Sequence, residues 1–177
     1  MTIEVKERGS KEFYEEVVNV LNQYRMFLAE PEADLANAFK TNLRQAILMA
    51  LMFVVMLLIG IRGRFSAVVI ICLAASGLAM VLTSVYLYRL RQQVNTFIAD
   101  DRTAVVTLDE TGVEFNKEGS QVVKLGWDNV ALVRAFSESV CFFAKDLSGV
   151  VIAVNGKYRQ EIFEYIKTAG IDVKTVK

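Results

Sequence analysis

The chain has 177 residues, of which 54% are hydrophobic and 23% charged, with 20 basic and 20 acidic side chains and no histidine. Soluble domains average about 45–50% apolar residues, so this composition points away from an ordinary soluble protein. The balanced charge excludes a basic nucleic-acid-binding arm. The lack of histidine removes the commonest general base and the commonest metal ligand.

Residues 1–42 are expected to form an N-terminal strand and an amphipathic helical segment. Alternation over Thr2–Lys6 favours the strand. Apolar residues then recur at three- and four-residue spacing after Ser10, a suitable N-cap, which predicts a helix over about 11–29. A second helix is expected to start near Pro31 and continue into the apolar region. Because acidic residues crowd the start of the first helix, we expect its apolar face to pack against the C-terminal domain or a second subunit.

Residues 43–91 predict a transmembrane helical hairpin, with spans at about 43–61 and 65–88 separated by a short basic turn. Apart from Arg44 near the start of the first span, neither span contains a charged residue. A hydrocarbon core of ~30 Å requires roughly 20 helical residues, so both segments are long enough. We expect no signal peptide, since the first apolar run follows some 40 mostly polar residues.

Basic residues flank the hairpin at both ends, four at its open end and two, Arg62 and Arg64, at its tip. The positive-inside rule therefore predicts a multi-pass protein of the cell membrane with both termini in the cytoplasm. The four residues at the open end are also the candidate contacts for anionic lipid head groups. They are Lys40, Arg44, Arg89 and Arg91.

Small residues four positions apart occur in both spans, a spacing that lets helices approach closely. Either the two spans pack on each other or they form the contact of a homo-oligomer. Because no charged side chain occurs in the spans beyond Arg44, the sequence argues against a transporter or proton relay. The small residues are Ala46, Ala50, Ala75 and Ala79.

Residues 103–177 predict a C-terminal domain of short strands joined by polar, glycine-bearing turns, followed by one helix over Lys157–Thr168. This order predicts an α+β protein whose C-terminal domain is a pleckstrin-homology-like (PH-like), partly open antiparallel β-barrel closed by one α-helix. The expected strands are Thr103–Leu108, Val113–Asn116, Gln121–Leu125, Ala131–Ser137, Ser139–Ala144 and Val150–Val154.

Two short motifs carry a resemblance to a known family. Thr107–Val113 reads T-L-D-E-T-G-V and Leu125–Val130 reads L-G-W-D-N-V. With its N-terminal segment and two adjacent spans, the chain resembles the YcxB-like family of bacterial membrane proteins. The resemblance implies an inner-membrane protein with a C-terminal domain similar to bacterial PH domains, and it brings no catalytic motif. The segment Ile152–Lys157 departs from the Ile-Pro-Lys-Arg-like sequence that members usually show.

The remaining candidate site residues are expected to be structural. Trp127, the single tryptophan, is expected to place its ring in the domain core from a short helical turn. Cys72 and Cys141 are expected to be free buried thiols. Neither a histidine partner for a cysteine nor a glycine-rich phosphate loop is present. We therefore expect no enzyme activity, no catalytic residue, no cofactor and no metal site.

Two hypotheses of function follow. The first is a membrane-tethered interaction module that binds an unidentified protein partner or a second copy, for example by adding a strand to an open sheet edge. The alternative is a sensor of lipid head groups or membrane surface charge that uses the basic residues at the open end of the hairpin.

Overall fold

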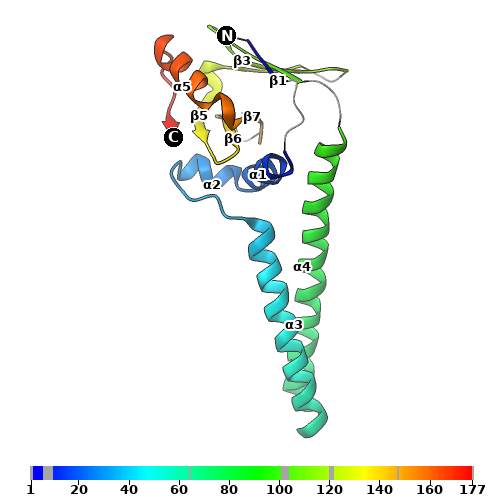
Figure 1. Ribbon diagram of the computed structural model, residues 1–177. Helices are drawn as coiled ribbons and strands as arrows, with labels where there is room; N and C mark the ends of the chain where they lie inside the picture. Colours follow the sequence, from blue (N-terminus) through cyan, green and yellow to red (C-terminus); the bar gives the residue numbers. More distant parts are fainter. Residues whose placement is uncertain are drawn as a thin grey trace. The chain divides into compact units, whose positions relative to one another are not determined.

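The computed structural model of the chain describes residues 2–5, 10–63, 65–100, 104–119, 122–146 and 148–176. It has an α+β fold in which two long apolar helices precede two β-sheets, as the sequence predicts (Figure 1). The chain divides into two compact units. Met1–Leu35 and Val94–Lys177 form one, named here the β unit, and Ala36–Gln93 form the other, named here the hairpin.

The two long helices are α3 (Ala38–Gly63) and α4 (Ala67–Ala99). At 1.5 Å per residue, α3 is about 39 Å long and α4 about 50 Å. Side-chain caps fix where they begin. The Asn37 side chain accepts a hydrogen bond from the Lys40 backbone N–H at 2.9 Å, and the Ser66 hydroxyl accepts one from the Val69 N–H at 3.4 Å. The second helix continues 11 residues beyond the predicted end of the span at residue 88.

The first sheet is antiparallel, and its strand order follows the chain. The turn between its second and third strands is fixed by Asp109, whose carboxylate accepts hydrogen bonds from the N–H groups of Thr111 at 2.7 Å and Gly112 at 3.0 Å. Glycine is required at 112 because a Cβ there would lie 2.3 Å from the Leu125 carbonyl oxygen. The four strands are β1 (Thr2–Val5), β2 (Ala104–Asp109), β3 (Gly112–Lys117) and β4 (Val123–Gly126).

The second sheet has the order β7-β6-β5-β8, and the last pair, β5 with β8, is parallel. Its strands are β5 (Val130–Ala135), β6 (Ser139–Ala144), β7 (Val151–Asn155) and β8 (Thr175–Val176). The described strands thus form two separate sheets, and they are not closed into a barrel. The expectation of purely antiparallel strands was wrong, because the chain end returns beside β5, where the Val133 N–H donates to the Lys174 carbonyl at 2.9 Å.

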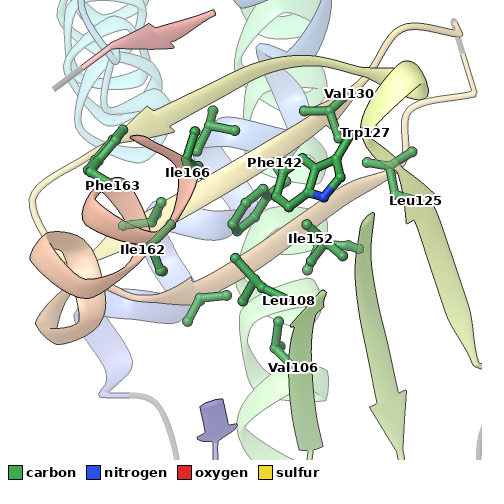
Figure 2. Packing of buried hydrophobic residues seen from close by; sticks show 14 of the residues in the cluster. Val106, Leu108, Leu125, Trp127, Val130, Phe142, Ile152, Ile162, Phe163 and Ile166 are labelled. Atoms are coloured by element: carbon green, nitrogen blue, oxygen red, sulfur yellow. The ribbon is translucent and has the colours of Figure 1, made fainter. Parts of the chain in front are cut away.

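Apolar side chains of both sheets form one core together with α5 (Arg159–Thr168), as Figure 2 shows. Leu108 and Phe142 are fully buried in it, one from each sheet. At the end of α5, Gly170 has a φ of 63°, and the N–H groups of residues 170 and 171 return to the carbonyls of Lys167 and Ile166. This is the hydrogen-bond pattern of a Schellman cap, which reverses the chain toward β8.

The N-terminal helices α1 (Lys11–Asn22) and α2 (Tyr24–Ala29) pack on the second sheet, so the predicted packing of this segment against the C-terminal domain is confirmed. Ser10 is the N-cap of α1, as expected, and accepts a hydrogen bond from the Phe13 N–H at 3.1 Å. Phe27 is fully buried in a cluster with Phe136 and Phe143. This second cluster therefore joins segments that precede and follow the hairpin in the sequence.

Two helix predictions in this region were wrong. The first helix is broken at Gln23, where the side-chain amides of Asn22 and Gln23 donate to helix carbonyls one turn back and compete with the backbone ladder. No helix starts at Pro31. Instead the Ala33 N–H donates to the Glu30 carbonyl at 3.0 Å in a turn with proline at its second position, and helical structure resumes only after the Asn37 cap.

Candidate functional site

The surface of the hairpin is apolar in nearly every direction. Only 6% of the most apolar 18-residue stretch of each helix is buried, and both helices are long and apolar enough to cross a membrane. Leu48 on α3 is 61% exposed, and Ile71 on α4 is 67% exposed. A core helix of a soluble protein buries such side chains, whereas these are uncovered within the chain.

Polar side chains within α4 form hydrogen bonds inside their own helix. The Ser76 hydroxyl donates to the Cys72 carbonyl at 2.8 Å, and the Thr83 hydroxyl donates to the Ala79 carbonyl at 2.8 Å. Such bonds remove the need for water or a partner at these positions.

The contact between the two helices uses small residues, but only part of the predicted set. Ser76 is buried, and a Cβ added at Gly77 would lie 3.7 Å from the Phe53 ring of α3. Ala46, Ala50 and Ala79 are partly buried, whereas Ala75 is exposed. The spacing of small residues indicated close packing, and the structure places a contact with α3 at Gly77, two residues beyond Ala75.

The four basic residues proposed for lipid contact lie near one end of the hairpin, Lys40 and Arg44 on α3 and Arg89 and Arg91 on α4. All four are exposed. The Arg91 guanidinium lies 5.7 Å from the centre of the Phe39 ring, a cation–π distance that sets these two residues at the same level. The role of Phe39 was missed from the sequence, because its partner is 52 positions away.

Trp127 lies in the first turn after β4, in the 3-10 helix η1 (Trp127–Asn129), and is 9% exposed. Its indole N–H donates to the Asp109 carbonyl at 2.8 Å, and its ring centre is 6.3 Å from that of Phe142 (Figure 2). A buried indole with its one donor satisfied is a packing element that ties η1 to the turn after β2.

Arg134 of β5 is a buried cation that the sequence gave no reason to single out. Its guanidinium lies 4.8 Å from the ring centres of both Phe27 and Phe136, and it donates to the Pro31 carbonyl at 2.6 Å. Burial lowers the pKa of this group, while the charges of Asp34 and Glu32 act to raise it. Arg134 thus holds the segment after α2 onto the second sheet.

The turn between β5 and β6 is held by charged side chains from both ends of the chain. Glu16 of α1 accepts hydrogen bonds from the Glu138 N–H at 3.0 Å and from the Ser139 hydroxyl at 2.7 Å. Arg159 of α5 donates to the Phe136 carbonyl on the other side. These side chains hold the turn in place from both sides.

The buried Cys141 thiol is not reactive, and the described residues contain no cluster of metal ligands. Burial raises the pKa of the Cys141 thiol to about 12, which keeps it protonated and unreactive at neutral pH. No group of three or more histidine, cysteine, aspartate or glutamate side chains in the described ranges is placed to hold a metal ion.

The outer edge of β7 is the longest sheet edge among the described strands. The Ala144 N–H donates to the Val150 carbonyl and the Gly156 N–H to the Glu138 carbonyl, which sets the alternation of the β6–β7 ladder. By that alternation, the backbone N–H of Ala153 points away from β6. The edge carries neither a charged residue nor a proline, the usual protections against added strands.

Together these features define an α+β protein with two helices long and apolar enough to cross a membrane, joined to a sheet-rich unit. Comparisons with protein-family models, curated proteins and solved structures found no match for this chain.

Proposed function

We propose that this chain is a non-enzymatic integral membrane protein with two spans, whose β unit binds a protein partner or a second copy at the membrane surface. The exposed apolar surface of the hairpin carries this proposal. Soluble monomers rarely expose contiguous apolar patches beyond about 300–600 Å², and here most of two long helices is apolar and uncovered. A bilayer is the solvent that such a surface requires.

The shared core of the β unit supports a topology with both termini on one side of the membrane. Phe27 precedes the hairpin and Phe143 follows it, yet their ring centres lie 5.9 Å apart. Two segments on opposite sides of a bilayer would be unable to form this contact. An even number of spans satisfies it, and the excess of basic residues at the open end favours the cytoplasmic side of a cell membrane.

The proposal includes a PH-like architecture for the β unit and the resemblance to the YcxB-like family. Two packed four-stranded sheets with a C-terminal helix against their common core support the PH-like assignment. Fold analogy says little about the ligand. The outer edge of β7 is the surface where we propose that a strand of the partner is added, because its outward-pointing backbone groups can pair with an extended segment.

The test is crosslinking in native membranes before solubilisation, followed by affinity purification and mass spectrometry, with the chain and two variants compared. Ala153→Pro removes the outward N–H of β7 without removing a bond to β6. Ala153→Ser keeps that N–H and serves as the matched control. A stoichiometric crosslinked protein, or a differently tagged second copy, is expected for the native chain and the serine variant and absent for the proline variant.

Equal crosslinking of the proline variant would refute the β7 edge as the binding surface. A chain released from membranes by alkaline washing would refute the membrane assignment separately. Fluorescence of Trp127 checks that each variant keeps its folded core.

A further inference from the structure

The charged side chains of the hairpin all have the same sign. All six charged side chains between residues 36 and 93 are cations, and no aspartate or glutamate occurs there. Basic residues exposed on a protein surface are usually interspersed with acidic ones that compensate them. Here the compensating negative charge has to come from outside the hairpin.

Four of these cations fall within a narrow axial band. The Arg91–Phe39 contact aligns the two antiparallel helices at that level. Arg44 is five residues from Phe39, which corresponds to an axial distance of about 7.5 Å, and Arg89 is two residues from Arg91, or about 3 Å. Lys40 lies between these limits. Cations from both helices therefore occupy one level of the hairpin.

The arrangement within the band favours an anion. Lys40 and Arg44 are four residues apart on one helix, so their side chains share a face and repel each other. An anionic group between them would convert this repulsion into attraction. Arg91 differs from Lys40, Arg44 and Arg89, because its guanidinium contacts the Phe39 ring and this contact aligns the two helices.

The band also lies where a membrane surface would be. Tyr86 and Tyr88, which are 38% and 63% exposed, sit beside it on α4, as aromatic residues do at a membrane interface. From the band, 17 uncharged residues separate Arg44 from Arg62, a helical length of about 26 Å. This is close to the ~30 Å thickness of a hydrocarbon core.

We propose that Lys40, Arg44 and Arg89 bind the phosphate groups of anionic phospholipids, with Arg91 as a positioning residue held by Phe39. This inference rests on the proposed membrane insertion, and it names the lipid chemistry that the hairpin selects. Phosphate oxygens match both the ammonium and the guanidinium donors, and guanidinium groups bind them in pairs. Each cation near an anionic surface contributes about fivefold in affinity.

The test measures lipid selectivity of the full chain reconstituted in vesicles of phosphatidylcholine and phosphatidylglycerol. Electron paramagnetic resonance of spin-labelled lipids gives the relative association of the anionic over the zwitterionic lipid. The triple variant Lys40→Gln, Arg44→Gln, Arg89→Gln is expected to lower this ratio at least about fivefold. A charge-keeping triple variant, Lys40→Arg, Arg44→Lys, Arg89→Lys, is expected to retain it.

A second control removes three exposed cations of the β unit, with Arg25, Lys124 and Lys145 each replaced by Gln, and therefore has the same net charge as the first variant. Its selectivity is expected to equal that of the native chain. Equal loss in this control, or unchanged selectivity in the hairpin variant, would overturn the proposal. Loss of selectivity on adding inorganic phosphate, beyond that caused by chloride at equal ionic strength, would assign the band to a soluble phosphate instead.

Membrane insertion is tested first, by washing the vesicles with alkaline buffer. A chain that this wash removes is not inserted, which refutes the proposed function and not the lipid selectivity, so only chains that remain are used for the lipid measurement.

Discussion

Replacing Phe27 with alanine tests whether the two ends of the chain fold as one cooperative unit. Phe27 belongs to α2, before the hairpin, and is fully buried. Its ring centre lies 5.2 Å from that of Phe136 and 5.9 Å from that of Phe143, both in the segment after the hairpin. The Arg134 guanidinium covers the ring at 4.8 Å. The substitution therefore empties a site that lies in a cluster formed by side chains from both sides of the hairpin in the sequence.

The expected loss of stability is about 3–5 kcal/mol, the usual range for removing a buried phenylalanine side chain. It includes lost burial, a cavity, and the weakened cation–π and aromatic contacts. With a urea dependence of about 2 kcal/mol per M for a unit of this size, the unfolding midpoint should fall by roughly 1.5–2.5 M.

Trp127 provides the assay, because it is the single tryptophan and lies in the other core cluster, between the two sheets. Its fluorescence during urea unfolding, in detergent solution of the full chain, reports the C-terminal part alone. Phe39→Ala is the control, since this residue belongs to the hairpin and is 36% exposed. It is expected to leave the midpoint unchanged.

A Trp127 transition that does not move in Phe27→Ala would refute the reasoning. It would mean that α1 and α2 unfold separately from the sheets, and the argument for both termini on one side of the membrane would lose its basis.

Three further predictions use the same urea assay. Gly112→Ala should destabilise the β unit by several kcal/mol, since its Cβ would lie 2.3 Å from the Leu125 carbonyl oxygen, whereas Gly119→Ala, with open space around it and a φ of 68°, should lose only about 1 kcal/mol. Tyr24→Phe should lose about 1–2 kcal/mol, because the one hydroxyl proton is shared between the Ala144 carbonyl at 2.8 Å and the Asp146 carbonyl at 2.6 Å. The buried Cys141 thiol, with its pKa raised to about 12, keeps its proton in the folded chain while the unfolded thiol loses it above about pH 8.5. The contribution of the protonated Cys141 thiol to stability is therefore complete below about pH 8.5 and is lost as the pH rises toward 12. This pH dependence should be absent from Cys141→Ala when the stabilities of the variant and the native chain are compared at each pH.

Local patterns predicted most of the elements, because their signals lie within a few residues. Continuous apolarity located both long helices, and polar turns separated the strands, with β6 found at its observed bounds over Ser139–Ala144. The start of α3 was missed because Asn37, a capping residue, competed with Pro31, which is a common first helical residue. Strand β8 has only two residues and no periodicity to detect.

The candidate site was predictable only in part, for a related reason. The four basic residues were evident from their position beside the apolar runs. The pairing of Arg91 with Phe39, the burial of Arg134 and the outward N–H of Ala153 depend on which segments meet in space. Sequence spacing carries no information on such contacts, since each joins residues from different elements.

The β unit consists of segments that precede and follow the hairpin in the sequence, and this affects its folding during synthesis. Phe27 leaves the ribosome 116 positions ahead of Phe143, and its core partners do not exist until the hairpin and most of the sheets have been synthesised. At about 5–20 residues per second, the apolar side of the N-terminal helices stays uncovered for roughly 6–23 s. Under the proposed membrane insertion, the hairpin enters the bilayer during that interval, and folding of the β unit is completed only afterwards. An insertion that left the two ends on opposite sides would leave both halves of this cluster uncovered.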